Sequence, residues 1–118
     1  MNPEDVHYDL IVTIVPKGSA DKPLRASQQA GAEGGTVFYG RGAGIHEKRK
    51  ILGVPIEPEK EILLTAVPRA LTERVLAAIV EAARLDAPGR GIAFVVALDK
   101  VTGICHTARV LEQGETPA

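Results

Sequence analysis

Apolar residues gather in four short runs along this chain, separated by polar, glycine-rich or proline-containing segments. The runs are continuous and rich in β-branched residues, and they cover residues 8–15, 35–39, 61–67 and 92–98. Continuous apolar runs of this length are typical of strands buried on both faces or nearly so. The pattern therefore predicts four strands.

Two segments between these runs have helical character. Residues 70–85 carry apolar side chains at three- and four-residue spacing, at Leu71, Val75, Ala78, Ile79, Ala82 and Ala83. This spacing predicts an amphipathic helix. Residues 19–30 have a weaker apolar stripe; we expect Ser19 to cap this helix and Gly31 to end it.

The predicted order is β-α-β-loop-β-α-β, the split βαβ or ferredoxin-like arrangement. It predicts an α+β fold in which two helices cover one face of a four-stranded antiparallel sheet. Several predicted strands are apolar on both faces, but the helices cover only one face of the sheet. We expect other copies of the chain to cover the second face, which predicts a homo-oligomer. We expect a single domain over residues 1–118, flexible tails at 1–7 and 111–118, and a possible extra strand at 104–110.

Composition narrows the classes of function. Hydrophobic residues make up 45% of the 118 residues, the net charge is −1, and the aromatic residues are two Phe, two Tyr and no Trp. Such a chain lacks the basic surface and stacking rings of a nucleic-acid-binding protein. Its one cysteine, Cys105, excludes an intrachain disulfide and fits a cytoplasmic protein. No signal peptide or membrane-spanning run is expected.

Two glycine clusters are candidate phosphate sites. The first, at residues 40–44, places Arg41 among Gly40, Gly42 and Gly44; the second, at 88–91, places Arg90 between Gly89 and Gly91. Glycine allows backbone N–H groups to surround an anion, and an arginine fork suits phosphate. The alternative is strand termination and a tight turn. Neither cluster opens an amphipathic helix as a dinucleotide fingerprint would.

The loop between the second and third predicted strands is long for so small a domain, which is typical of functional loops. Its candidate partner-binding residues are His46, Lys48, Arg49, Lys50, Ile51 and Leu52. A solvated loop is the alternative for the charged residues. Glu57, Glu59 and Glu61 would share one side of an extended segment and form a possible cation site, or a solvated base of the loop. Cys105 and His106 point to opposite faces of any strand and do not form a nucleophile pair.

Several segments together resemble the PII nitrogen-regulatory family, in particular its shorter PII-like members. They are residues 10–12, 35–37 leading to 42–44, the long loop, 59–61 and 88–94. The long loop resembles the family's T-loop and residues 88–94 its B-loop. The resemblance implies a ferredoxin-like homotrimer that binds ATP, ADP or AMP between subunits. It also implies nucleotide-binding roles for Thr36, Gly42, Gly44, Gly89, Arg90, Gly91 and Lys100.

Two functions follow as hypotheses. The first is a non-enzymatic trimeric sensor whose nucleotide-dependent T-loop regulates a target transporter or enzyme of nitrogen or carbon metabolism, with no metal and no tightly bound cofactor. The second is a small trimeric metal-binding protein or enzyme with a site at the subunit boundary, made by His46 with Glu57, Glu59 or Glu61. Fold alone does not decide between them.

Overall fold

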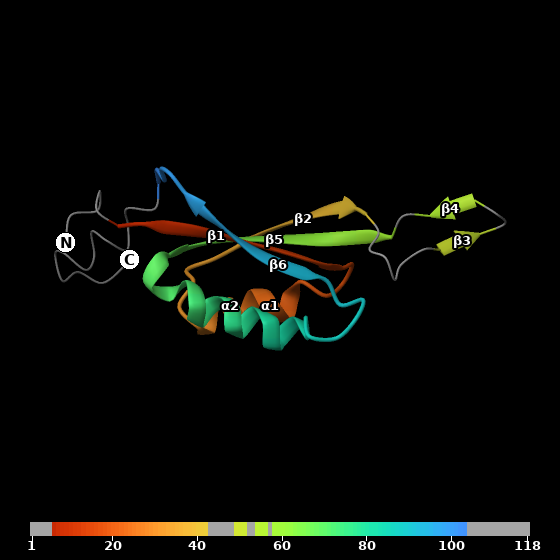
Figure 1. Cartoon of the computed structure of the whole chain (residues 1–118), viewed down its shortest axis with the longest axis horizontal. Helices are drawn as coiled ribbons and strands as arrows, with labels where there is room; N and C mark the ends of the chain where they lie inside the picture. Colours follow the sequence, from red (N-terminus) through yellow and green to blue (C-terminus); the bar gives the residue numbers. More distant parts are fainter. Residues whose placement is uncertain (1–5, 43–48, 52–53, 57, 104–118) are drawn as a thin grey trace.

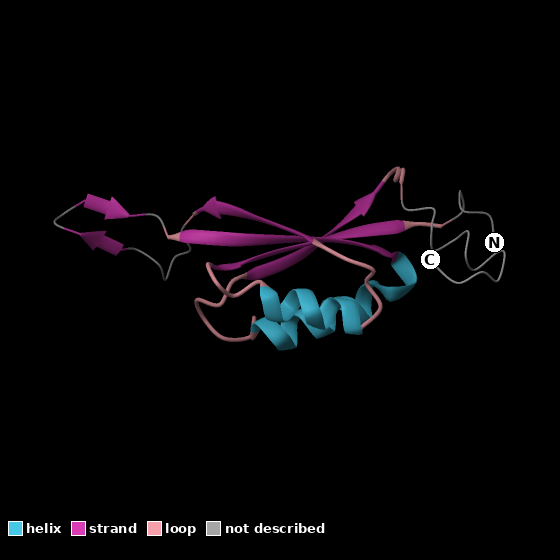
Figure 2. Ribbon diagram, turned by 180° about the vertical axis from the view of Figure 1, so that it is seen from behind, coloured by secondary structure: helices cyan, strands magenta, loops and turns pink. Residues whose placement is uncertain are grey.

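The computed structural model describes residues 6–42, 49–51, 54–56 and 58–103 of the chain. Its main body contains, in chain order, β1 (Tyr8–Pro16), α1 (Asp21–Gln29), β2 (Thr36–Arg41), β5 (Glu59–Pro68), α2 (Arg69–Ala83) and β6 (Ile92–Leu98). A separate two-stranded sheet, β3 (Arg49–Ile51) and β4 (Val54–Ile56), lies between β2 and β5 in sequence. Both helices lie on one side of the main sheet (Figures 1 and 2). The predicted ferredoxin-like α+β fold is confirmed.

The strand order of the main sheet is β2-β5-β1-β6, and each neighbouring pair is antiparallel. The central strand β1 pairs with β5 on one side and with β6 on the other, so Ile11 lies opposite both Thr65 and Val95. β2 and β6 are consequently the two edge strands. This arrangement decides which loops can meet within one chain.

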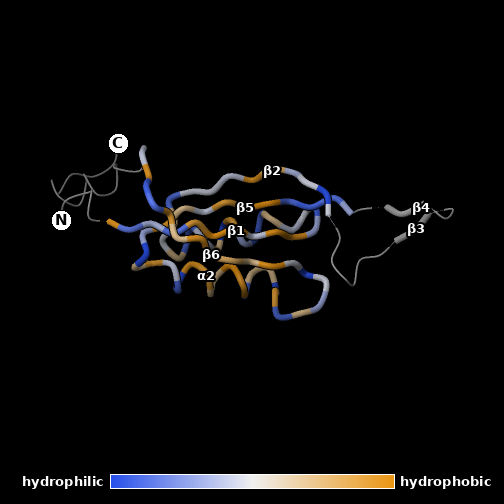
Figure 3. Tube along the Cα trace, turned by 45° about the horizontal axis from the view of Figure 1, so that its top comes forward, coloured by the Kyte–Doolittle hydropathy of each residue, from blue (hydrophilic) through white to orange (hydrophobic). Residues whose placement is uncertain are grey.

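The core lies between the sheet and the helices. Alternate residues of β1 and β5 point toward the helices, and Ile11, Val15, Leu63 and Val67 are completely buried there. From α2, Val75 and Ile79 complete the core. The hydrophobic colouring of Figure 3 runs along β5, β1 and β6 as well as α2. The other face of the sheet also carries apolar side chains, namely Leu10, Val12 and Ile14 of β1 and Phe94 of β6, although no helix of the described chain covers it.

The start of α1 differs from the prediction. Ala20, not Ser19, stands at the N-cap position, and no side-chain hydrogen bond from this residue caps the helix. The carboxylate of Glu61 on β5 instead accepts hydrogen bonds from the N–H groups of Gly18 and Ala20. At the other end, Gly31 follows the helix with a positive φ of 122°, as expected of a helix stop.

Boundaries of the other elements shift modestly. β2 continues through Gly40 and Arg41, beyond the predicted range 35–39, because these residues pair with Lys60 and Glu59. β5 correspondingly exceeds the predicted 61–67. α2 ends at Ala83 rather than at residue 85, since Arg84 adopts a left-handed φ of 57°. β6 has the predicted bounds.

Some predicted features lie outside the described residues, namely the strand at 104–110 and the tail at 111–118. Within the described ranges, no helix is long and apolar enough to cross a membrane.

Candidate functional site

The first glycine cluster lies where β2 ends and β5 begins. The N–H of Gly42 donates to the carbonyl of Pro58 at 3.2 Å and closes the base of the long connection between these strands. Gly40 is part of β2, and a Cβ there would lie 2.8 Å from Cδ1 of Ile62. Gly40 therefore serves packing. A Cβ on Gly42 would meet none of the described residues within 4 Å, so packing against that part of the chain does not require glycine there.

The second glycine cluster forms a tight turn between α2 and β6. Gly89 and Gly91 have positive φ angles of 78° and 123°. A Cβ on Gly91 would lie 2.1 Å from the carbonyl oxygen of Ile14, whereas nothing lies near that of Gly89. Arg90 is half-buried, and its Nε donates to the carbonyl of Ala83 at 3.4 Å. The arginine is thus directed to the C-terminal end of α2.

The two clusters lie at the same end of the sheet but on opposite edges. β2 runs toward this end and stops at Arg41, while β6 starts from it at Ile92, opposite Ile14. Three strand spacings of about 4.8 Å separate the edge strands, so Gly42 and the turn at 88–91 lie about 14 Å apart across the sheet. One chain does not bring the two clusters into a single small-anion site.

Two other predicted residues lie farther away. Thr36 pairs with Leu64, in the row that continues through Val12 to Phe94, so it lies about 20 Å along β2 from Gly42. Lys100 follows β6, which runs away from the glycine turn, and therefore lies beyond the opposite end of the sheet. Neither residue joins the glycine clusters within one chain.

Several predicted site residues cannot be placed. Gly44, His46, Lys48 and Leu52 lie outside the described residues. Arg49, Lys50 and Ile51 form β3, which pairs with β4, but their side chains are not described. The prediction that they bind a partner therefore stays a prediction.

The open face of the sheet is an extended apolar surface. Phe38 on β2 and Ile92, Phe94 and Val96 on β6 are each between 43% and 58% exposed. The β6 residues stand opposite Ile14, Val12 and Leu10 of β1, which share their side of the sheet. Exposed apolar patches of this extent mark interaction surfaces.

Two carboxylates at the loop end of the sheet, Glu59 and Glu61, have partners within the chain. Lys17 Nζ lies 2.7 Å from Glu59 Oε2, and the Glu61 carboxylate is held by the backbone of the β1–α1 turn. The hydrogen bond and charge of Lys17 lower the pKa of Glu59, and Glu59 raises the pKa of Lys17. Of the three carboxylates considered for a cation, Glu57 lies outside the described residues. The part of the chain that is described contains no group of His, Cys, Asp and Glu able to hold a metal ion.

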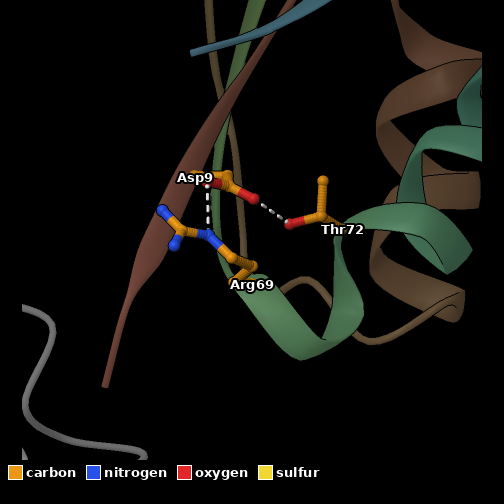
Figure 4. A network of polar contacts seen from close by, with 3 residues as sticks. All are labelled: Asp9, Arg69 and Thr72. Carbon is orange, nitrogen blue, oxygen red and sulfur yellow. Dashed lines mark hydrogen bonds and ion pairs between the residues drawn. The ribbon is translucent and has the colours of Figure 1, made fainter. Parts of the chain in front are cut away.

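A buried carboxylate that the sequence did not single out lies at the opposite end of β1. Asp9 accepts a hydrogen bond from the hydroxyl of Thr72 at 2.7 Å and one from Nε of Arg69 at 3.2 Å (Figure 4). The Thr72 hydrogen bond lowers the pKa of Asp9, burial opposes this, and Arg69 adds to the lowering. Asp9 lies inside an apolar run, and its two partners are more than fifty residues away in the sequence. No sequence pattern therefore indicated these hydrogen bonds, which become visible only when α2 is placed beside β1. It joins β1 to the start of α2.

Comparisons with known proteins agree with this fold. One similar solved structure is an Arabidopsis thaliana PII protein bound to citrate, with a TM-score of 0.64 and 23% identity, covering 86% of this chain and 83% of that one. Another is a Bacillus cereus protein related to NIF3, with a TM-score of 0.61 and 22% identity. That match covers 80% of the present chain and only 26% of the Bacillus protein. No curated protein matches the sequence.

The family assignment comes from the sequence itself. The family model described as "Nitrogen regulatory protein P-II" matches residues 8–107. This range includes all four strands of the main sheet, both helices α1 and α2, and the whole of the long connection between β2 and β5. The resemblance found from the sequence is confirmed, and the chain belongs to the nitrogen regulatory protein P-II family.

Proposed function

We propose that this PII-type regulatory protein is a non-enzymatic, cytoplasmic homotrimer that binds an adenine nucleotide at clefts between subunits. Binding would alter the long connection between β2 and β5, which corresponds to the family's T-loop. That loop would then dock on a regulated transporter or enzyme. The observation that carries the proposal is the position of the two glycine clusters on opposite edges of one sheet.

A second copy of the chain resolves this separation. If the β2 edge of one subunit lies beside the β6 edge of its neighbour, Gly42 of the first approaches the glycine turn of the second. Because β2 ends and β6 begins at the same end of the sheet, this requires only that the subunits share an axis roughly parallel to the strands. A closed ring of three would supply three such clefts.

The uncovered face supports the same assembly. Phe38, Phe94 and Val96 are all exposed, and the strand register places them on the side of the sheet opposite the helices. Packing these faces around a common axis would remove them from water, which contributes roughly 25 cal/mol for each Å² of apolar surface buried. The assembly therefore has a driving force that is independent of any ligand.

The ligand chemistry is that of a polyanion carrying a planar base. Gly42, Gly44, Gly89 and Gly91 would offer backbone N–H groups to the phosphates, and Arg90 a guanidinium already directed by α2. Thr36 would lie near the base, and Lys100 would have to come from another subunit. The Arabidopsis PII structure is bound to citrate, which is also a small polyanion.

The long connection would provide the surface for a protein target. It carries Lys48, Arg49 and Lys50 beside Ile51 and Leu52. A basic run next to apolar residues suits an acidic surface with an apolar pocket. The alternative, a metal site at the subunit boundary, loses support because Glu59 is ion-paired and Glu61 accepts hydrogen bonds from Gly18 and Ala20 before α1.

Calorimetry with ATP, ADP, AMP and cyclic nucleotides tests the proposal directly. We expect one adenine nucleotide per subunit to bind with a Kd below about 1 mM. Absence of binding heat for all of them, in a preparation shown to be oligomeric, would overturn it. Metal analysis of the same preparation separates the alternative, which requires a stoichiometric metal ion and no nucleotide.

A further inference from the structure

The turn between β1 and α1, residues 16–20, is tied to the first residues of β5. The N–H of Lys17 donates to the carbonyl of Glu59 at 3.3 Å, and its Nζ lies 2.7 Å from the Glu59 carboxylate. Two residues farther along β5, the Glu61 carboxylate accepts from the N–H groups of Gly18 and Ala20. Side-chain and backbone bonds thus join the same two segments.

Glu61 has the larger part in this connection. The first N–H groups of a helix lack partners within the helix and attract negative charge. α1 has no side-chain hydrogen bond from its own N-cap residue, Ala20, but the N–H of Ala20 itself donates to the Glu61 carboxylate of β5 at 3.4 Å. The Lys17–Glu59 ion pair is more than half exposed at both side chains, so it contributes little by itself.

The shape of the turn is specific. Gly18 has a φ of 88°, a conformation that side chains with a Cβ rarely adopt, and Ser19 N–H closes the turn on the carbonyl of Pro16 at 3.0 Å. This geometry presents the Gly18 and Ala20 amides to the same oxygen of Glu61. A change in the turn must therefore alter the bonds to β5.

The connection also lies between the two candidate ligand-binding elements. Glu59 directly follows Pro58, whose carbonyl is bonded to Gly42 at the base of the long connection. Glu61 pairs with Val15, and Val15 lies against Gly91 of the glycine turn. A displacement at either element would reach Glu59 or Glu61 within one strand.

We propose that residues 16–20 and the start of β5 form one coupled conformational element, in which Glu61 transmits displacement of β5 to the first turn of α1. Loss of the Glu61 contact releases the start of α1, and distortion of the turn loosens the start of β5. The coupling is reciprocal because both effects depend on the same contacts. It does not depend on which ligand the protein binds.

Amide hydrogen exchange of the assembled, ligand-free protein tests the first direction. We expect Glu61→Ala to accelerate exchange at Gly18 and Ala20 about tenfold and Glu61→Gln about threefold, since the amide keeps an oxygen acceptor but loses the charge. Arg25→Gln is the matched control: it breaks the exposed Asp21–Arg25 ion pair of α1 without touching β5. It should change these rates less than twofold. Unchanged rates in Glu61→Ala would overturn the proposal.

The second direction uses two glycine variants. Gly18→Ala strains the turn, whereas Gly34→Ala places a Cβ in open space with no unfavourable φ. We expect the amides of residues 59–62 to exchange faster than in the parent protein in Gly18→Ala. In Gly34→Ala we expect their exchange rates to be unchanged. Amides in the centre of α2 report global unfolding and should stay protected in both. If the start of β5 keeps its protection in Gly18→Ala while the turn exchanges faster, the two segments are not coupled.

Discussion

Gly91 lies so close to Ile14 that a Cβ on Gly91 would stand 2.1 Å from the Ile14 carbonyl oxygen. The contact fixes the path of the glycine turn across the end of β1 and, with a φ of 123°, excludes other residues. The glycine at this position is explained by packing and by the positive φ of a tight turn, which was the alternative to a phosphate site, and the phosphate role stays a prediction. Packing against β1 thus requires glycine at position 91, whereas a Cβ on Gly89 would meet none of the described atoms within 4 Å.

Gly91→Ala should lower the free energy of unfolding by about 2 kcal/mol or more, because both the contact with Ile14 and the positive φ oppose a side chain. Denaturant unfolding measures the change. Gly34→Ala, where a Cβ meets nothing, is the control. A Gly91→Ala protein within about 0.5 kcal/mol of the parent would show that the turn can move off β1 freely.

Asp9→Asn should reduce stability by about 1–2 kcal/mol, because the charged acceptor of the Thr72 and Arg69 hydrogen bonds is lost. The pKa of Asp9 is lowered from its ordinary value of 3.8, so its contribution is complete above that pH. The contribution then disappears as the pH falls through the lowered pKa of the folded protein. Between pH 7 and pH 2, the free energy of unfolding should decrease less in Asp9→Asn than in the parent protein. An equal decrease in the free energy of unfolding for the parent and Asp9→Asn would contradict this role of Asp9.

The architecture was predictable because it rests on local patterns. Apolar runs predicted all four main strands, and the spacing of Leu71, Val75 and Ile79 predicted α2. The polar contacts were not predictable in the same way. Glu61 reaches residues more than forty positions away at the start of α1, and Asp9 reaches Thr72 across 63 positions. Such contacts depend on strand order and register, which no local pattern encodes.

The candidate site was predictable in part. Glycine and arginine identified both clusters, but their location at one end of the sheet and on opposite edges requires the topology. The sequence suggested Arg90 as a phosphate ligand, and that role stays a prediction; what the structure shows is a hydrogen bond from its Nε to the carbonyl of Ala83 at the end of α2. No local sequence pattern indicates such a structural hydrogen bond.

Phe94→Asp should convert the proposed homotrimer into monomers, since it places a charge on the open apolar face. Val95→Asp is the matched control on the same strand and the opposite face, with nearly equal exposure in the single chain, 39% against 43%. Light scattering coupled to size exclusion gives the mass of each variant. An intact oligomer for Phe94→Asp would mean that the open face is not the subunit interface.

Arg90→Ala should weaken ATP binding at least about tenfold, as expected for loss of a charged hydrogen-bonding group at a phosphate. Because Arg90 also bonds to Ala83, the unfolding curve of each variant must be compared as well. Arg90→Lys keeps the charge but not the fork and should bind with intermediate affinity. Arg25→Ala, on α1, is the control for overall charge. Equal affinities for Arg90→Ala and Arg25→Ala would exclude Arg90 from the site.

A mixed-subunit experiment tests the central claim, that each nucleotide site is shared between two chains. Gly42→Val and Arg90→Ala should each abolish or strongly weaken ATP binding in uniform oligomers. When the two variants are co-expressed, random assembly unites an intact first cluster with an intact glycine turn in about a quarter of the clefts. We predict that ATP binding by the whole co-expressed population, uniform oligomers included, recovers to about that fraction with parental affinity. Oligomers of demonstrated mixed composition that bind no more ATP than either uniform variant would contradict the shared site.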